Sequence, residues 1–162
     1  MLADEPLFSK EMIVYVSNQQ KDLKLNELDI EKLVKEVVSF EGAHYDEVSI
    51  HFVDTHNICS LHDEYFNDPS PTDCISFPMD QDVQEEDPHK VLGDVVVCPE
   101  TAIKYAKINA CDIYEELTLY TVHGLLHLMG YDDIEEQDIQ KMREAEERHM
   151  KNLKKLDLCL SL

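Results

Sequence analysis

The chain of 162 residues lacks tryptophan, has only four glycines, and carries 14 lysines and arginines against 35 aspartates and glutamates. It contains no run of about 18 apolar residues, the length that a membrane-spanning helix needs. Charged residues also interrupt its first fifteen positions, which disfavours a signal peptide. We therefore expect a cytoplasmic protein without membrane contacts.

The scarcity of positive charge weighs against general nucleic-acid binding. The formal net charge of −21 gives a surface that repels phosphate, so a nucleic-acid ligand would need a local basic patch. Lys90, Lys104 and Lys107 lie in a less acidic stretch and could form such a patch, or they could be ordinary solvated positions. A partner with a basic surface would instead be attracted by complementary charge.

The cysteines do not indicate a disulfide framework. Their number is odd and no two are spaced as C-x-x-C, which favours reduced and mostly buried thiols. They are Cys59, Cys74, Cys98, Cys111 and Cys159.

The spacing of apolar residues predicts an α+β fold. Alternating patterns predict four strands, and spacings of three and four residues predict five helices. The length and an apolar content of 43% fit one core, so residues 1–162 are expected to form one domain. The expected strands are 12–16, 47–54, 73–77 and 91–97; the expected helices follow Asn26, follow Thr55 as a cap, span 100–109, follow Asp112 and span 135–156.

Three further expectations concern the edge of the sheet, one loop and the place of the last helix. Pro78 ends the third strand, which favours a sheet edge there. The acidic stretch 81–88 is expected to be a mobile loop. The charged helix 135–156 has few apolar positions, so we expect it on the outside of the molecule.

The stretch from His123 to Asp133 has the layout of a metal site. His123 and His127 are four residues apart, so on a helix both imidazoles lie on one face and can converge on one ion. Gly130 can adopt the left-handed conformation that ends a helix, after which the returning chain presents Asp133 as a third ligand. We therefore predict a metal site at the C-terminal end of a core helix.

Two other interpretations of the histidines remain open. Both rings could be core side chains with satisfied hydrogen bonds. The zinc-peptidase pattern H-E-x-x-H offers a second alternative, but it places a glutamate general base directly after the first histidine. This chain has Gly124 there, so a metallopeptidase would lack its base.

Three segments together resemble the YbeY family of bacterial metal-dependent endoribonucleases. Residues 123–133 closely resemble its H-G-x-L-H-L-x-G-Y-D-H signature, residues 71–78 (P-T-D-C-I-S-F-P) are similar to a second motif, and residues 92–97 (L-G-D-V-V-V) to a third. The segments follow the family order, and the resemblance covers roughly residues 45–150. It implies a hydrolase domain with a mixed four-stranded sheet packed with about five helices.

The resemblance also implies a function. A single-strand-specific endoribonuclease would hydrolyse RNA phosphodiesters with a water bound to one divalent ion, expected to be zinc. Its role would be 3′-end maturation of small-subunit ribosomal RNA and ribosome quality control. Its partners would be precursor ribosomal RNA, the small ribosomal subunit and basic ribosomal proteins. A ribosome-assembly protein with a structural metal is the non-enzyme alternative.

Two positions depart from the family pattern. The third ligand is usually histidine, whereas this chain has Asp133; zinc accepts a site of two histidines and one carboxylate, although iron, nickel or manganese would suit it too. Phe66 stands where the family usually has an arginine thought to contact phosphate. Either Lys90, Lys104 or another cation replaces that arginine, or activity is low.

No residue stands out as the general base. Asp73 and Asp132 are weak candidates. For Asp132, a role as a turn residue or as an acceptor that orients a ligand histidine is favoured over that of a base. Tyr131 is interpreted as a packing residue beside the site.

Overall fold

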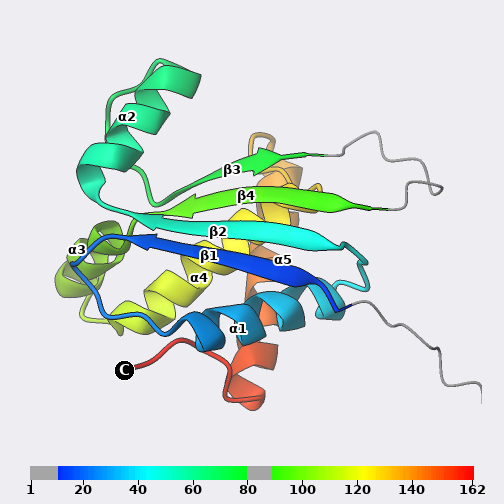
Figure 1. Ribbon diagram of the computed structural model, residues 1–162. Helices are drawn as coiled ribbons and strands as arrows, with labels where there is room; N and C mark the ends of the chain where they lie inside the picture. The colour runs from blue at the N-terminus through cyan, green and yellow to red at the C-terminus, as the bar shows by residue number, and fades with distance from the viewer. Residues whose placement is uncertain (1–10, 80–88) are drawn as a thin grey trace, which may run out of the picture.

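The computed structural model describes residues 11–79 and 89–162. It confirms an α+β fold with a mixed four-stranded sheet and five helices (Figure 1). The expected loop at 81–88 lies outside the described residues. In chain order the elements are β1 (Ile13–Gln19), α1 (Glu27–Phe40), β2 (Glu47–Val53), α2 (Thr55–Phe66), β3 (Cys74–Pro78), β4 (Val91–Val97), α3 (Pro99–Asn109), α4 (Ile113–Leu128) and α5 (Glu136–Lys155).

The sheet has the strand order β1-β2-β4-β3, which the sequence left open. Strands β1, β2 and β4 are parallel, and α1 makes the crossover between β1 and β2 that a parallel pair requires. Strand β3 pairs antiparallel with β4 and forms one edge, as its terminal proline predicts.

Helices α1, α4 and α5 lie on one side of the sheet, and α2 packs on the other (Figure 1). The main core contains the inward-facing residues of β2, including Ile50 and Phe52, and buried side chains of α1 and α4. Ile58 of α2 joins Ile75 and Val96 in a smaller cluster on the opposite face. Strand β3 therefore has α2 against one face and α4 against the other.

The helix starts are largely as predicted. Asn26 and Asp112 each accept a hydrogen bond from the backbone N–H of a residue in the first turn of the helix that follows. The prediction that Thr55 caps α2 is wrong: Asp54 is the cap and accepts the Asn57 N–H at 2.8 Å. Aspartate and threonine are both good caps, so the pattern alone did not choose between them.

The position of α5 corrects one expectation. Its charged face is exposed, but a stripe comprising Met142, Ala145, His149 and Leu153 is buried against the core. Because these residues recur at intervals of three or four, they form one narrow face that the low apolar content concealed. Helix α5 is thus part of the helical layer beside α4.

The five cysteines are free, as expected, but only Cys98 is buried and Cys111 is exposed. None of the helices in the described part of the chain is both long and apolar enough to cross a membrane.

Candidate metal centre

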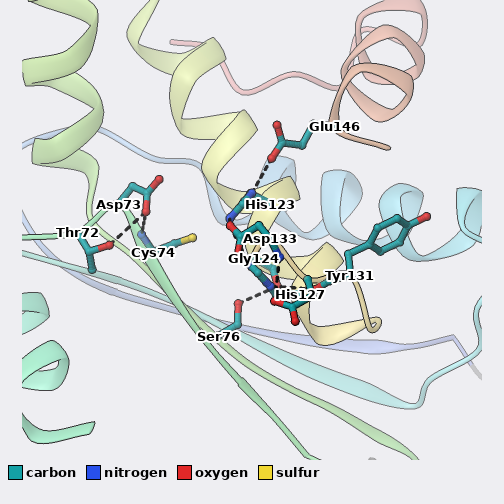
Figure 2. A network of polar contacts seen from close by, with 11 residues as sticks. Thr72, Asp73, Cys74, Ser76, His123, Gly124, His127, Tyr131, Asp133 and Glu146 are labelled. Atoms are coloured by element: carbon teal, nitrogen blue, oxygen red, sulfur yellow. Dashed lines mark hydrogen bonds and ion pairs between the residues drawn. The ribbon is translucent and has the colours of Figure 1, made fainter. Parts of the chain in front are cut away.

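Helix α4 brings the two predicted ligand histidines together in its last turns. The Nε2 atoms of His123 and His127 are 3.0 Å apart. The Asp133 Oδ2 atom lies 3.4 Å from the first and 3.5 Å from the second (Figure 2). Among the described residues, this trio forms the group of side chains that could hold a metal ion.

The turn after α4 places the carboxylate. The helix ends at Leu128, and Gly130 has the positive φ of 101° that the predicted stop requires. The Tyr131 N–H then bonds back to the Leu126 carbonyl at 3.0 Å, which reverses the chain. Asp133 consequently returns over the exposed ends of the histidine rings.

The outer nitrogen of each ring is fixed by an acceptor. His127 Nδ1 lies 2.9 Å from the Tyr131 carbonyl oxygen, which can only accept, so Nδ1 carries the proton. His123 Nδ1 lies 2.6 Å from a Glu146 carboxylate oxygen, with the same consequence. Both Nε2 atoms therefore present lone pairs to the space between them, beside an acidic oxygen. Such an arrangement requires a metal ion or a shared proton.

The spacing of the three atoms fits a tetrahedral ion. Zinc bonds of about 2.0–2.2 Å place neighbouring tetrahedral ligand atoms about 3.3–3.5 Å apart. The observed separations of 3.0, 3.4 and 3.5 Å differ from this by a few tenths of an ångström at most. Three protein ligands leave the fourth position open, as catalytic zinc sites do.

Local charge also favours a cation at this point. Burial lowers the pKa of His123, but Glu146 and the charges of Asp73 and Asp133 raise it by more, so the net pKa lies above its ordinary value. A metal ion would use the same surplus of negative charge.

Glu146 is the functional residue that the sequence patterns did not reveal. It lies on α5, 23 residues after His123, within the charged segment 135–156 that was expected on the outside of the molecule. The spacing of the helix could have indicated it: Glu146 follows Met142 by four residues and therefore borders the buried stripe of α5. A carboxylate that accepts from a ligand histidine fixes its tautomer and increases its basicity.

Replacing Glu146 with glutamine is expected to weaken zinc binding by about 10–100-fold without unfolding the protein. The amide can still accept one hydrogen bond but no longer supplies negative charge. Equilibrium competition with a zinc-binding dye measures the affinity. Glu147→Gln is the matched control, since Glu147 is exposed on the same helix turn. Equal affinities for the two variants would contradict the role of Glu146.

Tyr131 does more than pack beside the site. Its hydroxyl donates to Glu41 Oε2 at 3.0 Å, while its carbonyl accepts from the ligand His127. Glu41 also accepts from Arg148 at 3.0 Å and from the fully buried His149 at 2.6 Å. The end of α1 and the middle of α5 are thereby tied to the turn that orients a ligand.

Glu41→Gln is expected to lower the free energy of unfolding at pH 7 by about 1–3 kcal/mol. Burial raises the pKa of Glu41, but hydrogen bonds from His149, Tyr131 and Arg148 lower it by more, so it lies below its ordinary value. The folded protein therefore gains stability from the ionised group at neutral pH, and loses it as the pH falls below about 4.

Urea unfolding across pH 3–7 tests this. The variant should be less stable near neutrality and should show a flatter decline on acidification. Glu31→Gln is the control, because Glu31 pairs with Lys35 at the surface and its replacement should change stability by less than about 1 kcal/mol. A parallel acid profile for Glu41→Gln and wild type would contradict the role of Glu41.

A cleft of about 410 Å³ opens in front of the three ligand atoms. Helix α2 and strand β3 form its other walls, and Asp73 lines it. Asp73 Oδ1 accepts the Cys74 N–H at 2.7 Å, which holds the carboxylate in place (Figure 2). Asp132, the other candidate base, instead accepts the Asp133 N–H at 2.8 Å as a turn residue and does not line this cleft.

A sequence model of the family described as Endoribonuclease YbeY matches residues 15–154. The chain belongs to the YbeY family. A YbeY protein of Protochlamydia amoebophila is 58% identical over 149 residues, covering 92% of this chain and 98% of that protein. One of Chlamydia caviae is 37% identical over 151 residues, covering 91% and 95%. Both are named Endoribonuclease YbeY.

A solved structure agrees on the fold. The solution structure of a Thermotoga maritima protein matches with a TM-score of 0.58 at 24% identity, covering 86% of this chain and 87% of the other. The family model and the two named relatives confirm the resemblance to the YbeY family.

Phe66, one of the two positions at which this chain departs from the YbeY pattern, lies in the cleft in front of the metal ligands. Phe66 lines the cleft beside His62, one turn earlier on α2, with ring centroids 5.8 Å apart. The predicted substitutes lie elsewhere: Lys104 pairs with Glu100 at 3.3 Å, and Lys90 does not line the cleft. Of the described residues that line this cleft, none is a lysine or arginine. An aromatic wall therefore stands where the resemblance implies a positive charge.

Proposed function

We propose that this chain is a metal-dependent endoribonuclease that hydrolyses phosphodiesters of single-stranded RNA. The observation that carries the proposal is the convergence of two histidine lone pairs and a carboxylate oxygen at the floor of an open cleft, in a chain of the YbeY family. Relatives named Endoribonuclease YbeY support RNA as the substrate.

His123, His127 and Asp133 would hold the ion, which we propose to be zinc. When bound, such an ion lowers the pKa of a coordinated water toward about 7 and offsets charge on the phosphate oxygens. Glu146 keeps His123 in the tautomer that leaves Nε2 free, and the Tyr131 carbonyl does the same for His127. Because no lysine or arginine is among the described cleft residues, the bound ion would supply the positive charge that attracts phosphate.

Asp73 is the residue we assign to proton transfer. Its carboxylate is anchored by the Cys74 N–H and lines the same cleft as the ligands. An ionised carboxylate there can take a proton from an attacking water. The rings of His62 and Phe66 offer a surface on which an unpaired base can stack, which favours single strands over duplexes.

The wider role proposed is 3′-end maturation of small-subunit ribosomal RNA and ribosome quality control in the cytoplasm. Residues 1–162 would act as one hydrolase domain. Precursor ribosomal RNA and the small subunit would be the partners, and the net charge of −21 suits contact with basic ribosomal proteins.

Cleavage assays with purified protein test the proposal. The substrates are a single-stranded oligoribonucleotide, its duplex, a small-subunit ribosomal RNA precursor and a peptide. Each is incubated with protein as isolated, stripped by a chelator, and reloaded with zinc. We expect cleavage of the single strand and the precursor only, lost on stripping and recovered on reloading.

The assembly-protein alternative draws on the acidity of the chain and on Phe66. It predicts bound metal without cleavage of any substrate, and that result would overturn the endoribonuclease proposal. A metallopeptidase would cleave the peptide. Position 124, where such an enzyme has its glutamate, weighs against it: a Cβ atom there would lie 2.4 Å from Val95 Cγ1, so the position faces the sheet.

A further inference from the structure

A second recess opens beside the metal cleft, between α3, α4 and the segment that leads into β3. Its volume is about 520 Å³, within the range of about 300–1,000 Å³ typical of small-molecule sites. Thr72, Asp73 and His123 line both hollows, so the two share a wall. A chain whose phosphate lies at the metal cleft can therefore place a neighbouring group in this recess.

The walls of the recess are connected by a hydrogen bond between two of its elements. The Thr101 hydroxyl donates to the Thr72 carbonyl at 3.1 Å, joining α3 to the segment before β3. On α4, Glu116 and Tyr120 lie one turn apart on the wall of the recess, and Tyr120 is only 6% exposed. Tyr105 stands at the other side with 46% of its surface exposed, so its ring remains available to a ligand.

The charge of the recess indicates what it can bind. Glu116, Asp73 and Glu146 line it, and no lysine or arginine does among the described residues. Carboxylates only accept hydrogen bonds, so a phosphate would be repelled and a group rich in N–H donors would be attracted. Burial and the nearby acidic side chains raise the pKa of Glu116.

A nucleobase combines the required features of a flat apolar face and an edge of donors. Guanine is the base whose Watson–Crick edge presents two adjacent donors, N1–H and the N2 amino group, which match the two oxygens of one carboxylate. Single-stranded RNA exposes this edge, and its bases stack on aromatic side chains.

We propose that the recess binds a guanine of the RNA strand next to the phosphodiester at the metal cleft, with Glu116 accepting from its Watson–Crick edge and Tyr105 contacting its face. This inference rests on the proposed function, since the ligand is RNA. It adds a base preference that the metal site alone would not produce.

The test compares two fluorescent single-stranded oligoribonucleotides that differ in one guanine replaced by inosine, which lacks only the N2 amino group. Zinc-loaded protein is titrated for binding by anisotropy, under conditions too short for turnover, and cleavage is then followed separately. We expect wild type to bind the guanine strand about tenfold more tightly. Glu116→Gln should remove this preference, and Tyr105→Ala should weaken both strands alike.

Glu115→Gln is the matched control. It removes the same charge from the adjacent position, which pairs with Lys154 at the surface and does not line the recess. The control should keep the preference for guanine, and zinc content should be unchanged in all variants. Equal binding of the two strands by wild type, an undiminished preference in Glu116→Gln, or no binding would overturn the inference.

The two proposals fail separately. Preferential binding of guanine without any cleavage would support the recess and contradict the endoribonuclease proposal. Cleavage with no difference between guanine and inosine in binding or rate would support the endoribonuclease proposal and contradict the guanine recess.

Discussion

His127→Ala is expected to abolish zinc binding and RNA cleavage together, while the protein remains folded. The side chain supplies one of three converging ligand atoms, and its Nε2 lies 3.0 Å from that of His123. Loss of an outer partner of a ligand costs about 10–100-fold in metal affinity, so loss of the ligand itself should cost more. Zinc content after dialysis and the initial rate on single-stranded RNA measure both effects.

His56→Ala is the control for this substitution. His56 is exposed on α2 and does not line the cleft, so zinc content and rate should equal those of wild type. Circular dichroism checks that both variants are folded. Stoichiometric zinc in His127→Ala would show that the ion binds elsewhere, and normal cleavage without zinc would contradict metal dependence.

Gly124→Ala is expected to destabilise the protein by about 1–3 kcal/mol, because an added methyl overpacks the contact between α4 and the sheet. Its Cβ would lie 2.4 Å from Val95 Cγ1 and 3.3 Å from Ser76 Oγ. The Ser76 hydroxyl also donates to the Gly124 carbonyl at 2.8 Å, so the helix cannot move away without losing a hydrogen bond. Urea unfolding measures the loss, and zinc affinity should fall as the ligand helix shifts.

A double-mutant cycle isolates the cause. Val95→Ala removes the methyl groups that collide with the new one, at a cost of its own because Val95 is fully buried. If the contact is responsible, Gly124→Ala combined with Val95→Ala will be more stable than the sum of the two single effects predicts. Strict additivity would place the strain at another contact.

Much of this architecture is predictable from local patterns. Alternation defines β2 and helical spacing defines α4, because each period selects one buried face. The ligands follow in the same way: His123 and His127 share a helix face, and the positive φ of Gly130 brings Asp133 back to them. These features depend on residues at most ten positions apart.

The remainder depends on contacts between distant segments. The hydrogen bond from His123 to Glu146 exists only because α5 packs beside α4. The strand order and the recess lined by Tyr105 and Glu116 likewise arise from packing that no local period encodes. The resemblance covered the motifs, but it could not indicate that Phe66 would lie beside His62 in the cleft.

The three ligands differ in how firmly they are held. Glu146 and the Tyr131 carbonyl fix the two histidine rings, whose side chains are 22% and 26% exposed. The Asp133 side chain is 41% exposed, and within the described residues only the two histidines contact its carboxylate. Exchange of an ion with solvent should therefore begin with Asp133 swinging outward, so that this turn sets the rate of metal turnover while the histidine pair sets the affinity.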